Sequence, residues 1–306
     1  MLSNITALQF AYSQLESNDK KILLDTADSL YNQQKYEDAI TLYDKVLATD
    51  PNDINALSGK GDVLFAQGRC QEAIMSYDRI LTIDVNDVYA LSSKGACLFS
   101  LGQDEEAIIW LDKALAIDPN EAYALEKKAI MLHDKGEYEE AIILYDKMLG
   151  IDPENANALT NKGIALDENG DFDKAMISLD KALAIDPKNL EALKNKAITL
   201  HDKGEYSEAI IWYDKALEID TTAVDILNNK GRALFDAGRY TEAIIWYDKA
   251  LEIDPKEVDV LINKSHALFN LGDEKKALTY IDKALEVDPN NENILELKKT
   301  IIDSAR

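Results

Sequence analysis

Hydrophobic and small residues return along this chain with a period of 34 residues, and polar positions fill the space between them. An alanine marks the period eight times, without an insertion or deletion, at Ala39, Ala73, Ala107, Ala141, Ala175, Ala209, Ala243 and Ala277. A fixed period of this length is typical of a solenoid, in which each unit packs on its neighbours. We number the positions of each repeat from 1 to 34, starting at Lys20, so that the alanine is position 20.

Within each repeat the apolar positions predict two helices. Positions 4 and 11 are always leucine, and position 8 between them is always alanine, glycine or serine. Spacings of four and three residues place these side chains on one stripe of a first helix, helix A. A second helix, helix B, has apolar residues at positions 20, 21, 24, 27, 28 and 30. Because these positions span nearly half of the helix circumference, we expect helix B to pack against helices on two sides.

Glycine and proline mark the ends of the helices. Position 15 is glycine in seven repeats and Gln34 in the first, and glycine suits the left-handed residue that closes a helix. All six prolines occupy position 32, where each ends helix B: Pro51, Pro119, Pro153, Pro187, Pro255 and Pro289. Val85 and Thr221 replace proline in the other two repeats, so looser turns are expected there.

This set of positions resembles the tetratricopeptide repeat. The match includes the leucines at 4 and 11, a small residue at 8, an aromatic residue at 17, alanine at 20, tyrosine at 24, Ala-Leu at 27 and 28 and proline at 32. The repeat over 224–257 carries nearly all of them, whereas Cys70, Asp104 and Glu274 replace the aromatic residue at position 17. The resemblance implies an all-α, right-handed solenoid (superhelix) of antiparallel helix pairs, with the A helices lining a concave groove over roughly one superhelical turn.

The period also predicts the domain organisation. Residues 292–306 are expected to form a C-terminal capping helix, since a solenoid needs a polar cap over its last open face. Residues 1–19 are expected to form an N-terminal helical segment that caps the first repeat. The alternative is an arm that folds into its own groove or onto another copy. Eight repeats fill residues 20–291, at 20–53, 54–87, 88–121, 122–155, 156–189, 190–223, 224–257 and 258–291.

Two charged positions vary little from repeat to repeat. Position 7 is lysine in repeats two to eight, and position 25 is aspartate in all eight. We predict that the aspartate of one repeat pairs with the lysine of the next, for example Asp44 with Lys60 and Asp248 with Lys264. Such pairs would fix the register between repeats, although exposed ion pairs stabilise by only about 0 to 1 kcal/mol each.

The candidate binding surface lies on helix A, opposite its apolar stripe. These groove positions are 2, 6, 9 and 13, flanked by 5 and 12. Position 6 is asparagine in the last four repeats, at Asn161, Asn195, Asn229 and Asn263. A carboxamide both donates and accepts, so it can hold the backbone of an extended peptide whatever its side chains are. This resembles the peptide-holding asparagine ladders of some tetratricopeptide and armadillo proteins. The alternative is that these asparagines only solvate an exposed helix face.

Aromatic and charged groove residues complete the candidate site. Tyr89 and Tyr123 at position 2 are candidate anchors for apolar side chains of a partner, whereas the aromatic residues at position 12 are interpreted as the edge of the core. Acidic groove residues outnumber basic ones, of which the main three are Lys127, Lys194 and Arg232. No three successive repeats carry the lysine and asparagine set with which family members grip a C-terminal carboxylate. The groove therefore predicts a neutral or basic, extended partner.

The net charge of −24 disfavours several classes of function. It argues against nucleic-acid binding, which needs an excess of lysine and arginine on one face, and it repels anionic membranes. No apolar stretch reaches 18 residues, and we expect no secretory signal, since residues 1–10 contain no basic region and no long apolar run. The only two cysteines, Cys70 and Cys97, lack metal-site spacing. We therefore expect a cytoplasmic protein without a metal or cofactor.

No catalytic arrangement is predicted either. His133 and His201 both stand at position 12, but they are two repeats apart, too far for one dyad or one metal. The sequence contains no glycine-rich phosphate loop and no nucleophile motif. The predicted function is therefore not enzymatic: an adaptor or scaffold that holds an extended partner segment in the groove. The alternative is a self-assembling structural scaffold, a homo-oligomer formed through the tails or the exposed solenoid ends.

Overall fold

The computed structural model describes residues 19–304 of the chain, and no strand occurs among them. A first helix covers residues 19–32. The helices that follow are α2 (Tyr36–Thr49), α3 (Ile54–Ala66), α4 (Cys70–Ile83), α5 (Val88–Ser100), α6 (Asp104–Ile117), α7 (Ala122–Asp134), α8 (Tyr138–Ile151), α9 (Ala156–Glu168), α10 (Phe172–Ile185), α11 (Leu190–Asp202), α12 (Tyr206–Ile219), α13 (Val224–Asp236), α14 (Tyr240–Ile253), α15 (Val258–Asn270), α16 (Glu274–Val287) and α17 (Glu292–Ser304). This confirms the predicted all-α solenoid of helix pairs.

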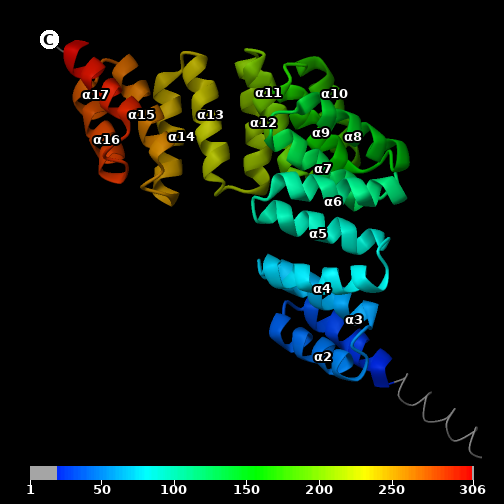
Figure 1. Cartoon of the computed structure of the whole chain (residues 1–306). Helices are drawn as coiled ribbons and strands as arrows, with labels where there is room; N and C mark the ends of the chain where they lie inside the picture. Colours follow the sequence, from blue (N-terminus) through cyan, green and yellow to red (C-terminus); the bar gives the residue numbers. More distant parts are fainter. Residues whose placement is uncertain (1–18, 305–306) are drawn as a thin grey trace, which may run out of the picture. The chain divides into compact units, whose positions relative to one another are not determined.

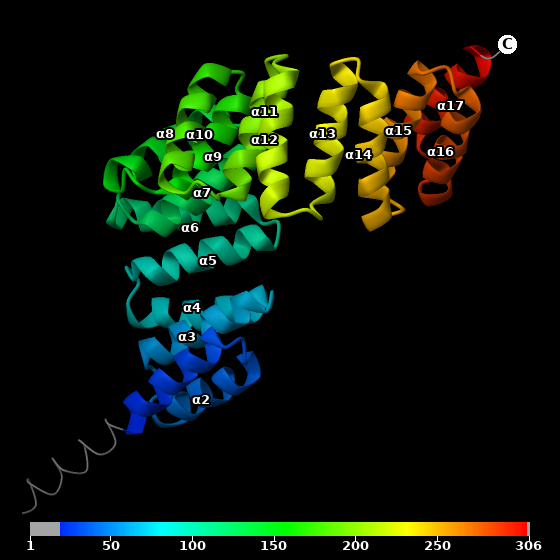
Figure 2. The same ribbon diagram turned by 180° about the vertical axis from the view of Figure 1, so that it is seen from behind.

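The chain divides into two compact units, residues 1–151 and 152–306. Within each unit, successive helices lie side by side and run antiparallel, as α13 and α14 do in both views (Figures 1 and 2). The odd-numbered helices from α3 to α15 are the predicted A helices, and the even-numbered helices from α2 to α16 are the B helices. Within residues 19–304 no helix is both long and apolar enough to cross a membrane.

The small residue at position 8 makes room for the large residue at position 24 of the same repeat. Tyr247 on α14 is buried, and a Cβ added to Gly231 on α13 would lie 2.3 Å from its Cε1 atom. Gly61 meets Tyr77 in the same way, with 2.6 Å between the added Cβ and Cε1. The close approach of helices A and B thus explains why this position carries only small residues.

The turn between helices A and B is closed by a left-handed residue, as the glycine pattern predicts. The seven position-15 glycines have φ between 71° and 81°, and Gln34 adopts the same region at 60°. At the start of several A helices the side chain at position 34 accepts a hydrogen bond from the backbone N–H three residues later. These N-caps are Asp53, Asp87, Asn155 and Asn189. Each such cap stabilises a helix by about 1 kcal/mol.

The predicted ion pairs between neighbouring repeats are confirmed. Lys60 Nζ lies 2.6 Å from Asp44 Oδ1, and Lys298 Nζ lies 2.7 Å from Asp282 Oδ1. The same contact joins Asp78 to Lys94, Asp112 to Lys128, Asp180 to Lys196, Asp214 to Lys230 and Asp248 to Lys264. The last three lysines are buried, so these pairs are shielded from water more than surface pairs usually are.

At the C-terminal end, α17 packs two isoleucines onto the preceding helices. Ile294 and Ile301 are buried in one cluster with Leu268 and Ile281. The capping role of α17 and the bounds of the repeats stay predictions. The expected N-terminal cap lies almost wholly outside the described residues.

Candidate functional site

The groove positions of the second unit lie on four A helices. Helix α11 contacts both α9 and α13, and α13 contacts α15, so their position-6 asparagines follow one another across adjacent helices. All four asparagines are partly exposed. The arrangement brings Asn161, Asn195, Asn229 and Asn263 onto one continuous helical layer.

The four asparagine carboxamides differ in the hydrogen bonds that they make within the protein. The Asn195 amide donates to Glu191 O and to Glu191 Oε1, both at 2.8 Å, and the Asn263 amide donates to Asn228 Oδ1 at 2.9 Å. Asn161 and Asn229 make no side-chain hydrogen bond within the described residues. A peptide could therefore use both ends of Asn161 and Asn229 at once, whereas Asn195 and Asn263 offer mainly their carbonyl oxygens.

The three basic candidates are in different environments. Lys194 Nζ lies 3.0 Å from Glu191 Oε2 and 3.4 Å from Asp225 Oδ2. Burial lowers the pKa of Lys194, but the two carboxylates raise it by more than burial lowers it, so the net shift is upward. The ammonium group therefore stays protonated, and the carboxylates balance its charge. Lys127 Nζ lies 5.0 Å from the centre of the Tyr123 ring. Arg232 is exposed and has no carboxylate partner within the described residues.

The two candidate tyrosines belong to the first unit. The Tyr89 hydroxyl donates to Asp62 Oδ1 at 2.5 Å, and the Tyr77 hydroxyl donates to the same oxygen at 2.9 Å. Burial raises the pKa of Asp62, although both hydroxyls oppose this by hydrogen bonding to the carboxylate. The Tyr89 side chain is thereby held in place while 45 % of the residue stays exposed. Tyr123 is half-buried.

The aromatic residues at position 12 pack against the apolar core, in agreement with their interpretation as the edge of the core. Phe65, Phe99, Phe235 and Phe269 each lie partly buried against a different hydrophobic cluster.

An acidic cluster around His201 is not predicted by the repeat pattern. His201 Nε2 lies 2.7 Å from Asp236 Oδ2 of the next repeat, and its Nδ1 lies 3.3 Å from Asp202 Oδ1. On the neighbouring A helix, burial raises the pKa of Asp167 to about 6, although a hydrogen bond with Thr199 lowers this pKa in part. The Oδ1 atom of Asp167 is buried and has no hydrogen-bond partner. In the part of the chain that the structure describes, no group of three or more histidine, cysteine, aspartate or glutamate side chains is arranged so that it could hold a metal ion.

Family models match this architecture along much of the chain. Models of the tetratricopeptide repeat match residues 24–88, 64–129 and 234–301, which together make up more than half of the sequence. The chain is a tetratricopeptide repeat protein. A further model, described as anaphase-promoting complex, cyclosome, subunit 3, matches residues 134–216.

Solved structures show the same fold at low sequence identity. A crystal structure of the anaphase-promoting complex hetero-tetramer Cut9–Hcn1 is similar with a TM-score of 0.66 and 18 % identity, over 96 % of this chain and 59 % of that one. This tetratricopeptide repeat protein thus spans about 59 % of that relative's length. Pseudomonas aeruginosa PilF is similar with a TM-score of 0.58 and 22 % identity, over 70 % of this chain and 97 % of PilF. No curated protein sequence matches the chain.

The family match indicates a general class of function. Tetratricopeptide repeat proteins are generally non-catalytic scaffolds for protein interactions.

Proposed function

We propose that this tetratricopeptide repeat protein is an adaptor that holds an extended segment of a partner protein on its groove positions. The observation that carries the proposal is the run of four asparagines on the adjacent helices α9, α11, α13 and α15. Evenly placed carboxamides can bind the backbone of an extended chain, and Asn161 and Asn229 have no internal hydrogen bond to give up.

The charge of the groove residues favours a neutral or basic partner segment. Asp167, Asp202 and Asp236 lie at groove positions, and the carboxylates there attract a cationic side chain more than an anionic one. Lys194 is already neutralised by two carboxylates, so an acidic peptide gains little there. Arg232 and Tyr89 are proposed as further contacts, together with Tyr123 and Lys127.

The organisation proposed with this function is eight repeats over residues 20–291 and a capping helix over 292–306. We further propose that the protein acts in the cytoplasm, without an enzymatic activity, and binds neither nucleic acid nor membranes. The net charge of −24 supports the last two points.

The triple variant Asn195→Ala/Asn229→Ala/Asn263→Ala tests the groove. Each lost hydrogen bond costs about 1 kcal/mol, so the variant should capture its partner at least about tenfold less tightly. The measurement is quantitative pull-down from source lysate with the full chain as bait, followed by titration of the captured protein. Circular dichroism should be unchanged, because all three side chains are partly exposed. Thermal unfolding should shift only slightly, through the lost bonds of Asn195 to Glu191 and of Asn263 to Asn228.

The matched control is Asn86→Ala/Asn120→Ala/Asn290→Ala, which removes three exposed turn asparagines away from the groove positions. Equal capture by the two triple variants would contradict the groove proposal. Growth of the mass with concentration in light scattering, with no captured protein, would instead favour the self-assembling scaffold.

A further inference from the structure

The B helices carry an exposed face that combines isoleucine and lysine. Positions 22, 26 and 30 are four residues apart and therefore share one side of the helix, which we call the B face. Most of the exposed large hydrophobic residues in the described chain stand at positions 22 and 30. On α12, for example, Ile211 is 55 % exposed and Ile219 is 43 % exposed. On α10, α12 and α14 of the second unit the B face consists of Ile177, Lys181 and Ile185, Ile211, Lys215 and Ile219, and Ile245, Lys249 and Ile253.

The basic residues of the B face are not paired with acids. Position 26 is lysine or arginine in all eight repeats, at Lys45, Arg79, Lys113, Lys147, Lys181, Lys215, Lys249 and Lys283. Within residues 19–304 none of them contacts a carboxylate, whereas the position-7 lysines of the same repeats form the ion pairs described above. Acidic residues outnumber basic ones by 57 to 33, so a missing partner for a whole row of cations is notable.

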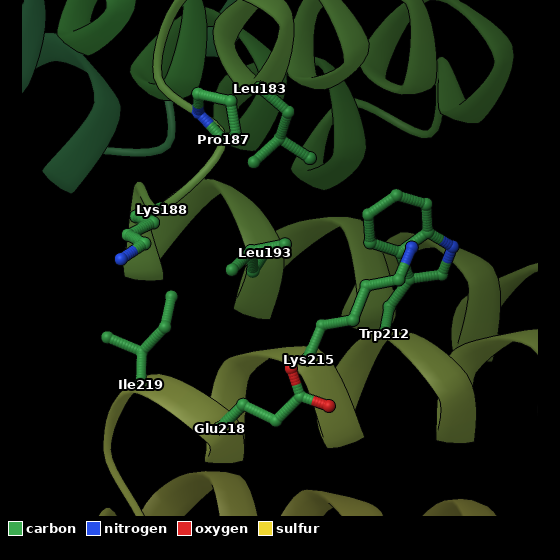
Figure 3. A pocket seen from close by; sticks show the side chains of 8 residues that line it. All are labelled: Leu183, Pro187, Lys188, Leu193, Trp212, Lys215, Glu218 and Ile219. Atoms are coloured by element: carbon green, nitrogen blue, oxygen red, sulfur yellow. The ribbon is translucent and has the colours of Figure 1, made fainter.

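A hollow of about 810 Å³ lies between two successive B helices, α10 and α12. Leu183 and Pro187 form one side, Leu193 lies on its floor, and Ile219 stands across from them (Figure 3). Trp212 lies at one end, with Lys215 Nζ 3.4 Å from its ring centre and Lys196 Nζ 3.6 Å from it.

Charge is concentrated at the rim of this hollow. Lys188 stands across the hollow from Trp212, and neither Lys188 nor Lys215 has a carboxylate partner in the described chain (Figure 3). Glu218 is the carboxylate among the lining residues. The hollow thus combines an apolar floor with the ammonium groups of Lys188 and Lys215, which lack ion-pair partners, and with the carboxylate of Glu218.

The same hollow recurs in the first unit, with a volume of about 530 Å³. Its lining takes the equivalent positions of the repeat: Leu81, Val85, Leu91, Trp110, Lys113 and Ile117. Ala116 stands where the other hollow has Glu218, and Asp78 in this lining is neutralised by Lys94 at 2.5 Å. Asn86 stands where the other hollow has Lys188, so Lys113 is the unpaired cation of this lining within the described residues. The hollow with its tryptophan and its position-26 lysine thus occurs in both units.

We propose that these hollows on the B face are a second binding surface, which takes an acidic protein segment that carries large apolar side chains. The apolar floor accepts the apolar side chain, and the unpaired lysines accept the flanking carboxylates. The chain as a whole repels acidic partners, so the row of cations on the B face selects where such a segment can bind. This surface does not use the groove positions.

A short peptide that alternates glutamate and leucine is the probe, and the same peptide with lysine for glutamate is its counterpart. The full chain should bind the acidic peptide in fluorescence polarisation, and added salt should weaken this binding. The basic peptide should bind at sites other than the B face. Binding of the acidic peptide should also change the tryptophan fluorescence, since Trp110, Trp212 and Trp246 all stand next to position-26 lysines.

The variant Lys181→Glu/Lys215→Glu/Lys249→Glu should lower the affinity for the acidic peptide at least about tenfold. The control Lys21→Glu/Lys135→Glu/Lys299→Glu changes the net charge by the same amount at exposed sites outside the B face. Circular dichroism checks that both variants fold. Equal loss in the two variants, or no binding of the acidic peptide to the native chain, would overturn the proposal. The asparagine triple variant should bind the acidic peptide normally, so this test and that of the groove fail independently.

Discussion

At the scale of single residues, space decides which side chains the repeat tolerates. Position 8 faces the large side chain at position 24 of the same repeat, and glycine leaves it enough room. Where alanine stands at position 8 instead, as at Ala129 and Ala197, it is fully buried. The identity of this one position therefore reports how closely helices A and B approach each other.

Gly231→Ala should destabilise the protein although alanine is the better helix former. The added Cβ would lie 2.3 Å from Tyr247 Cε1, and such overpacking costs about 1 to 3 kcal/mol, against a gain of up to about 1 kcal/mol in helix propensity. Urea unfolding should show a lower midpoint.

The matched control is Gly150→Ala on α8, where an added Cβ meets no atom within 4 Å. That variant should unfold at a higher urea concentration, because only the propensity gain of about 0.5 to 1 kcal/mol applies. A change of the same sign in both variants would refute the steric explanation.

At the scale of helices, the aspartate at position 25 and the lysine at position 7 join each B helix to the next A helix. The environment of this pair changes along the chain: the Lys60 side chain is 28 % exposed, whereas that of Lys230 is 5 % exposed. Burial lowers the pKa of Lys230, and its bond to Asp214 opposes this. The buried ammonium thus depends on its aspartate more than the exposed one does.

We therefore expect Asp214→Asn to cost more than Asp44→Asn. Loss of Asp214 leaves a buried ammonium without its counter-ion, at about 1 to 3 kcal/mol, whereas an exposed pair contributes about 0 to 1 kcal/mol. Thermal unfolding of the two single variants makes the comparison, and added salt should narrow the difference only slightly. Equal costs would show that burial of the lysine does not matter.

Contacts between positions that carry the same residues in nearly every repeat could be predicted from the sequence, and contacts that occur at one junction alone could not. The glycine turns and the pairing of Asp44 with Lys60 follow from positions that recur in nearly every repeat. The bond from His201 to Asp236 joins position 12 of one repeat to position 13 of the next. Such a contact depends on how one repeat is rotated against its neighbour, and the period carries no information on that rotation.

For the same reason, the hollows of the B face could not be predicted from the sequence. Trp212 and Lys188 belong to different repeats, and their distance depends on how far successive B helices are splayed. The position-6 asparagines recur in the sequence, but the bond between Asn263 and Asn228 that occupies one of them does not. The sequence therefore predicts which residues lie on adjacent helices better than it predicts which of their polar groups are free.

At the scale of the whole molecule, stability is built from neighbouring contacts. The hydrophobic clusters of the second unit pass from one helix pair to the next, and the last of them includes residues of α15, α16 and α17. A change at the end of such a chain should therefore lower the stability mainly of the adjacent helices.

Removal of residues 292–306 should expose Leu268 and Ile281 and loosen α15 and α16. Hydrogen exchange should then show lost protection in these two helices and native protection in α9 to α12. Removal of residues 305–306 alone is the control. A uniform loss of protection across the second unit would mean that it unfolds as one cooperative block rather than from its end.

The pair between positions 25 and 7 also bears on how such a protein changes over generations. The same aspartate–lysine pair joins successive repeats. The deletion or duplication of one whole repeat therefore again places a position-25 aspartate next to a position-7 lysine. Unequal recombination within the gene can therefore lengthen or shorten the protein in steps of 34 residues without creating a mismatched junction.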